Sequence, residues 1–135
     1  HIEYWFQSQE GSGDLWAHVD FNEKLRDRIN AGEKLQPKEL MSPITISCYL
    51  EAIDLEGGEF CVSETSWLDY ERELNPPEVL KEELLKYTHE SFQPTKGAVL
   101  YFEGSRYYHW INEVKRGSRK SMLINFWDDC SLKSI

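Results

Sequence analysis

Apolar and polar residues alternate over short stretches along most of the chain, the pattern typical of half-buried β-strands. In Ile44–Leu50, Thr45, Ser47 and Tyr49 share one face of the predicted strand, and apolar residues share the other. Other stretches predicted as strands are Ile2–Gln7, Leu15–Val19, Gly58–Val62, Ala98–Phe102, Tyr107–Val114 and Ser118–Trp127. The pattern predicts an all-β protein with minor helices.

Two longer stretches interrupt this pattern. Pro76–Glu90 is predicted to be a helix, because a proline stands in its first turn and Leu80, Leu84 and Tyr87 share one helical face. Glu23–Leu40 is charged and is expected to contain a short helix. Lys115-Arg116-Gly117 is predicted to be a hairpin turn between the last two strands. This arrangement favours a β-sandwich or a closed double sheet over a βαβ fold.

Size and charge narrow the function classes. With 135 residues the chain is expected to form a single domain, residues 1–135, and because it begins with His1 rather than Met we expect it to be processed or truncated at the N-terminus. Its net charge of -9 makes nucleic acid a poor partner, and no apolar run is long enough for a membrane span. The three cysteines lack CxxC spacing, which favours a reducing, cytoplasmic location over a disulfide framework.

The first candidate for chemistry is the segment Trp16-Ala17-His18-Val19-Asp20. On a strand, His18 and Asp20 point the same way, so both side chains can reach one point. An imidazole and a carboxylate so placed supply two ligands of the 2-His-1-carboxylate triad that binds Fe(II) in non-haem oxygenases. An HxD tripeptide alone is weak evidence, because a polar pair at a strand end is the commoner explanation.

A second group of residues lies near the C-terminal end of the chain. His109 is in a predicted strand, Arg119 follows ten residues later, and Ser121 shares the face of Arg119. A guanidinium in a barrel interior requires an anion, which a dicarboxylate would provide. Arg119 could instead be a surface charge near a turn, since three other basic residues surround it.

The chain contains, in order, the motifs HVD, YL, GGEF and PTKGAVLYF, then a later histidine and GSR. Together these motifs resemble the iron- and 2-oxoglutarate-dependent dioxygenases, closest to the prolyl 4-hydroxylase branch. The resemblance runs from about Trp16 to Trp127, with its motifs in family order. It implies a double-stranded β-helix, also called a jelly roll. It also implies an enzyme that uses Fe(II), consumes 2-oxoglutarate and hydroxylates an aliphatic carbon, such as that of a prolyl residue. Ascorbate is a further candidate cofactor by the same resemblance.

The resemblance also implies roles for individual residues. His18, Asp20 and His109 would bind the iron and form the catalytic centre. Arg119 would bind the distal carboxylate of 2-oxoglutarate, Tyr49 matches a tyrosine that hydrogen-bonds this carboxylate, and Ser121 matches the serine of an RxS variant. Asn125, from its strand parity with Arg119 and Ser121, is a candidate to point inward near the metal, the alternative being a structural hydrogen bond.

One contact of the family differs here. Relatives carry a tyrosine about ten residues before the first metal histidine, whereas this chain reads Phe6-Gln7-Ser8-Gln9. The contact is therefore absent, replaced by glutamine or displaced to Tyr4.

Two other functions are alternatives, a non-catalytic jelly-roll binding module and a nucleic-acid demethylating dioxygenase. The demethylating branch matches HVDFNE but requires a second arginine after Arg119, which this chain lacks. The substrate is expected to be a peptide, a protein or a small molecule, bound between Asn22–Ser42 and Thr65–Phe92. The acidity of these segments would tolerate a basic or neutral substrate.

Overall fold

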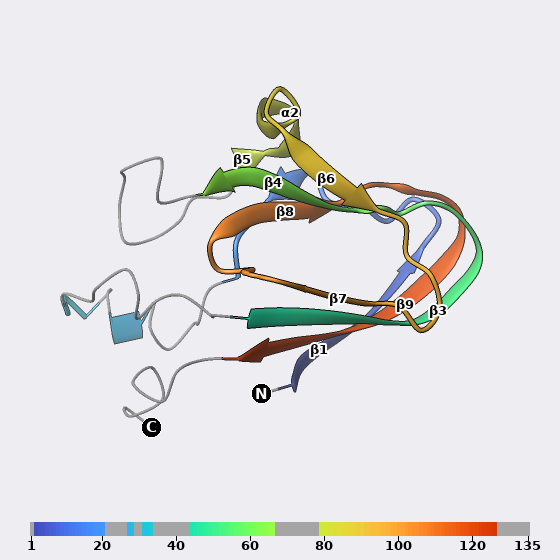
Figure 1. The fold of residues 1–135 in the computed structure, drawn as a ribbon, viewed down its shortest axis with the longest axis horizontal. Coiled ribbons are helices and arrows are strands. Elements are labelled where there is room, and N and C mark those ends of the chain that lie inside the picture. The colour runs from blue at the N-terminus through green and yellow to red at the C-terminus, as the bar shows by residue number, and fades with distance from the viewer. Residues whose placement is uncertain (1, 21–26, 29–30, 34–43, 67–78, 127–135) are drawn as a thin grey trace.

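The computed structural model describes residues 2–20, 27–28, 31–33, 44–66 and 79–126. Within these ranges the protein is mostly β-sheet, with a four-residue helix and a helical pair at residues 27–28, so the predicted all-β class is confirmed. Figure 1 shows two layers of strands facing each other across an interior. The described strands do not close into a barrel through hydrogen bonds.

The larger layer is a four-stranded sheet in the order β1-β9-β3-β7, with all neighbours antiparallel. Its strands are β1 (Ile2–Gln9), β3 (Ile44–Gly57), β7 (Val99–Phe102) and β9 (Val114–Phe126). In Figure 1, β3 and β9 are long and curve together towards the opposite layer. Irregularities in their register, typical of β-bulges, permit this curvature.

The opposite layer is a three-stranded sheet in the order β6-β4-β8. It contains β4 (Phe60–Ser66), β6 (His89–Phe92) and β8 (Tyr107–Ile111). A two-stranded ribbon of β2 (Trp16–Ala17) and β5 (Val79–Leu80) and the helix α2 (Lys81–Leu84) complete the described elements. Buried Leu84, Tyr108 and Trp110 form part of the core here.

The predicted helix over Pro76–Glu90 is wrong for most of its described length. Leu80 pairs with Trp16 in the β2–β5 ribbon, the helix itself covers only Lys81–Leu84, and the segment from His89 joins β4 as a strand. Strand pairing with distant residues therefore overrides the helical spacing, and Tyr87 remains exposed. Residues 76–78 and most of Glu23–Leu40 lie outside the described residues; residues 27–28, which are described, are helical.

The predicted hairpin at Lys115-Arg116-Gly117 is also wrong. These residues lie inside β9, and β8 and β9 belong to different sheets. Gly117 has a φ of 79°, which suits a bulge as well as a turn, and a Cβ at this position would overlap the backbone of Ile53 and Asp54. The sequence predicted left-handed backbone here correctly, but Gly117 stands opposite a bulge in β3 rather than in a hairpin turn.

The face of the larger sheet that points inward is polar. Thr45, Ser47 and Tyr49 of β3 are buried, whereas Ile44 on the other face is exposed. On the neighbouring β9 the buried polar residues are Arg119, Ser121 and Asn125. A protein interior lined this way must satisfy each polar group internally or with a ligand. Among the described residues, no helix is long and apolar enough to cross a membrane.

Candidate metal centre

Backbone pairing brings His18, Asp20 and His109 together from distant parts of the chain. His18 and His109 form an isolated antiparallel bridge, with N–H to carbonyl distances of 3.0 and 2.9 Å. The Asp20 N–H donates to the Gly104 carbonyl at 2.9 Å, which holds this segment against the turn before β8. The alternation of side chains after β2 then directs His18 and Asp20 to the same region.

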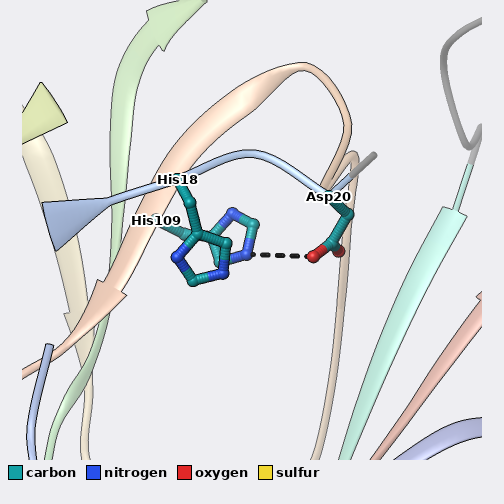
Figure 2. Close-up of side chains that lie close together, drawn as sticks. All are labelled: His18, Asp20 and His109. Carbon is teal, nitrogen blue, oxygen red and sulfur yellow. Dashed lines mark ion pairs between the residues drawn. The ribbon is translucent and has the colours of Figure 1, made fainter. Parts of the chain in front are cut away.

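Each of the three side chains offers one ligand atom, and these atoms lie within 4.8 Å of one another (Figure 2). The His109 Nε2 atom is 3.5 Å from Asp20 Oδ1, and the two imidazole rings have centroids 4.5 Å apart. Ligand atoms at about 2.1 Å from one ion can be at most about 4.2 Å apart, so a small side-chain rotation suffices to bind a metal. The group can hold a metal ion.

A hydrogen bond orients the His109 ring. Its Nδ1 lies 3.1 Å from the Tyr107 carbonyl, which can only accept, so Nδ1 carries the proton and Nε2 faces Asp20. Burial favours neutral His109, but the charge and hydrogen bond of Asp20 outweigh this effect and raise its pKa. Burial also favours the neutral form of Asp20 and would raise its pKa, but His109, His18 and the Thr45 hydroxyl lower the pKa. Without metal, the two therefore favour an imidazolium–carboxylate pair.

The carboxylate of Asp20 is fixed from behind by a buried polar chain. The Thr45 Oγ1 lies 3.1 Å from Asp20 Oδ2 and 2.6 Å from Asn125 Oδ1, and Thr45 is fully buried. A hydroxyl has one proton, so Thr45 donates to one of these oxygens at a time. If the Asn125 amide is turned over, its NH₂ donates to Thr45 and Thr45 donates to Asp20. Either arrangement restricts the orientation of the carboxylate.

Gly104 permits this close packing. A Cβ on Gly104 would overlap Asp20 Oδ2 and Thr45 Oγ1 at distances that real Cβ atoms do not show. Aromatic rings enclose the other side of the site, since the centroids of Phe60 and Phe102 lie 5.6 and 5.0 Å from that of His109. Such an apolar wall limits solvent access and strengthens electrostatic interactions at the centre.

A second polar group lies further along the same inner face. Arg119 is 2% exposed, donates from Nη1 to the Gly58 carbonyl at 3.1 Å, and has its Cζ 5.8 Å from the centroid of the Tyr49 ring. No acidic residue of the described ranges forms an ion pair with it. Burial lowers the pKa of Arg119, although Tyr49 and Asp14 oppose the shift. The guanidinium is thus a buried cation without a carboxylate partner in the described part of the chain.

Tyr49 provides a second buried donor beside Arg119. Its hydroxyl oxygen is buried and has no hydrogen-bond partner of good geometry. Burial raises the pKa of Tyr49 against the opposing effects of Arg119 and Ser47, so the group is a neutral donor. A buried donor beside an unpaired buried cation fits an anionic ligand that accepts from both.

The remaining candidates lie on the same face. Ser121 is buried and pairs with Tyr49 across β3 and β9, and Asn125 pairs with Thr45 near the metal group. Asn125 therefore lies behind Asp20 and at the opposite end of this face from Arg119, in the position of a structural partner. On β1, Ser8 pairs with Arg119, and its Oγ lies 3.5 Å from Arg119 Nε.

Sequence reasoning did not single out Thr45 or Gly104 as site residues. For Thr45 a signal was present, because a polar stripe with Ser47 and Tyr49 along a buried strand is unusual. His89 lies apart from the triad, with Nδ1 3.1 Å from the Tyr87 carbonyl and its ring 5.4 Å from that of Trp110. A scan against protein-family models and a search of curated proteins both find no match to this chain.

Proposed function

We propose that the protein is an Fe(II)- and 2-oxoglutarate-dependent dioxygenase that hydroxylates an aliphatic carbon, with a prolyl residue in a peptide as the first substrate to test. The observation that carries the proposal is the convergence of His18, Asp20 and His109 in an enclosed group that can hold a metal. The two facing sheets agree with the double-stranded β-helix implied by the family resemblance, which we propose as the fold.

The donor set fits Fe(II). Two imidazoles and one carboxylate are the ligands of the facial triad, which leaves adjacent positions on the iron for other ligands. When bound, iron in such a site supplies the redox chemistry that activates dioxygen at the expense of 2-oxoglutarate. The protein orients the ligands through the Tyr107 carbonyl and the Thr45 hydroxyl, and Phe60 and Phe102 limit the access of water.

The co-substrate fits the second polar group. Arg119 would pair with the distal carboxylate of 2-oxoglutarate, and the Tyr49 hydroxyl would donate to the same carboxylate. This contact would satisfy the buried Tyr49 hydroxyl and neutralise the buried guanidinium, two features that are costly in an empty interior. Ser121, the neighbour of Tyr49 on β9, would be a further donor to this anion.

An assay for succinate tests the proposal. Purified protein is loaded with Fe(II) without oxygen and then given 2-oxoglutarate, air and a prolyl peptide, with and without ascorbate. We expect succinate to accumulate over many turnovers, and His18→Ala to abolish it. His89→Ala is the matched control, because His89 lies outside the triad, and it should retain activity. Iron and 2-oxoglutarate binding without succinate, with peptide and small-molecule substrates alike, would instead indicate a binding module.

A further inference from the structure

A pocket of about 360 Å³ opens beside the metal group. It is lined by Val62, Ser63 and Glu64 of β4, Glu90 of β6 and Tyr107 of β8. Val62 is the register partner of His109, and Tyr107 precedes His109 by two residues on the same strand. Two residues of a strand span roughly 7 Å, so a molecule in the pocket lies next to the proposed iron site.

The pocket lies at an irregularity in β4. Between the pairs Val62–His109 and Ser66–Tyr107, three residues of β4 stand opposite one residue of β8. The Thr65 N–H donates to the Ser63 hydroxyl at 3.1 Å, which stabilises the distorted backbone locally. Such bulges often occur beside active sites, where they redirect side chains and interrupt pairing.

The pocket is negatively charged. Glu90 pairs with Val62, and the Glu64 N–H donates to the Thr88 carbonyl, so the two glutamates are diagonal neighbours on adjacent strands. Diagonal neighbours lie roughly 7–8 Å apart and remain within reach of long side chains, so both glutamates can approach one cation. Neither glutamate forms an ion pair with a described residue.

The basic residue nearest in sequence to the pocket lining already has partners. Arg106 pairs with Glu103 at 3.4 Å, and its Cζ lies 5.2 Å from the centroid of the Tyr107 ring. Two like charges on neighbouring strands repel each other, and a bound cation would reduce this repulsion. The net charge of -9 would also attract such a ligand from solution.

We propose that this pocket binds a positively charged group of the substrate, an ammonium or guanidinium, between Glu64 and Glu90. The assignment of the ligand as a substrate rests on the proposed dioxygenase function, whereas the cation site rests on the pocket itself. The carbon to be hydroxylated then lies several bonds from the charge, because the two glutamates lie on β4 and β6, whereas His109 lies on β8. The charge belongs either to a basic residue of a peptide or to a free amino acid.

An NMR titration of the full chain tests this proposal without requiring activity. The probes are Nα-acetyl-lysine N-methylamide, its Nε-acetylated neutral form, and free lysine, each added to metal-free and to zinc-loaded protein. We expect at least one charged probe to shift the amide signals of Val62 and Tyr107 saturably, while the neutral form does so much more weakly. Tighter binding of the blocked amide indicates a peptide substrate, and tighter binding of free lysine indicates an amino acid; both agree with the proposal.

Matched variants separate a specific site from general attraction. The double variant Glu64→Gln, Glu90→Gln should weaken binding of the charged probe by about 5- to 30-fold, as expected for two partly exposed charge pairs. The control Glu82→Gln, Glu83→Gln removes the same charge from exposed positions on α2 and should have little effect. Equal loss in both variants, or equal binding of the neutral probe, would overturn the proposal. Specific binding without any succinate formation would leave the cation site intact and refute only the dioxygenase function.

Discussion

Thr45→Val removes one hydroxyl from behind the proposed iron site and preserves the shape of the side chain. Thr45 is fully buried, and its Oγ1 lies within hydrogen-bonding distance of both Asp20 and Asn125. The variant therefore frees the orientation of the Asp20 carboxylate without altering any of the three metal ligands. We expect weaker metal binding in a protein that still folds.

The magnitude follows from the two contacts. Loss of an outer-shell partner typically lowers metal affinity by about 10- to 100-fold, which corresponds to about 1.4–2.7 kcal/mol. Because the hydroxyl donates a single proton, its loss should also lower the free energy of unfolding by about 1–3 kcal/mol. These effects differ in kind, so metal affinity and thermal stability are measured separately.

Competition with a fluorescent chelator gives the affinity for Mn(II) or for Fe(II) without oxygen. Thr45→Ser keeps the hydroxyl and should retain most of the affinity. Ser47→Ala removes a buried hydroxyl from the same strand face, further from Asp20, and should leave metal binding unchanged. A folded Thr45→Val protein with wild-type affinity would refute the reasoning that this hydroxyl positions the carboxylate.

Three further predictions follow from the site. Arg119→Met should weaken 2-oxoglutarate binding by about 2–5 kcal/mol in calorimetry. It should also raise the melting temperature of the ligand-free protein, because it removes a buried charge whose pKa is lowered by burial. A lower melting temperature with unchanged affinity would contradict this prediction. Gly104→Ala should cost about 1–3 kcal/mol of stability and displace Asp20, so that chelator competition detects weaker metal binding. In metal-free protein the raised pKa of His109 means that its contribution to stability is complete below its ordinary pKa of 6.5 and is lost as the pH rises through the raised value. Thermal denaturation from pH 6 to 9 should show this loss in the wild type and a smaller one in Asp20→Asn, and identical slopes would exclude the ion pair.

The strands were predictable because alternation is a local signal. The predicted strand in Ile44–Leu50 appears as the start of β3, and the predicted strands at Ala98–Phe102 and Ser118–Trp127 overlap β7 and β9. The predicted helix failed because Leu80 and His89 pair with strands distant in sequence, which a local pattern cannot indicate. The positive φ of Gly117 was readable, but the choice between a turn and a bulge depends on which strand lies opposite.

Side-chain parity explains how much of the candidate site was predictable. The HxD spacing places His18 and Asp20 on one side of an extended segment, whatever the rest of the fold does. That His109 lies opposite them follows from a bridge between residues far apart in the chain, for which only the family resemblance gave a hint. The roles of Thr45 and Gly104 were not predictable from the sequence, because they depend on contacts with Asp20 that appear only in three dimensions.

The most direct test of the proposed function is the dependence of 2-oxoglutarate binding on both the metal and the Arg119 guanidinium. Calorimetry with 2-oxoglutarate on Mn(II)-loaded protein avoids turnover and requires no knowledge of the substrate. We expect one bound equivalent per chain in the metal-loaded wild type, and a large loss of affinity without metal, in His109→Ala and in Arg119→Met. Equal 2-oxoglutarate affinity with and without metal, or no binding to the metal-loaded wild type, would contradict the proposed function.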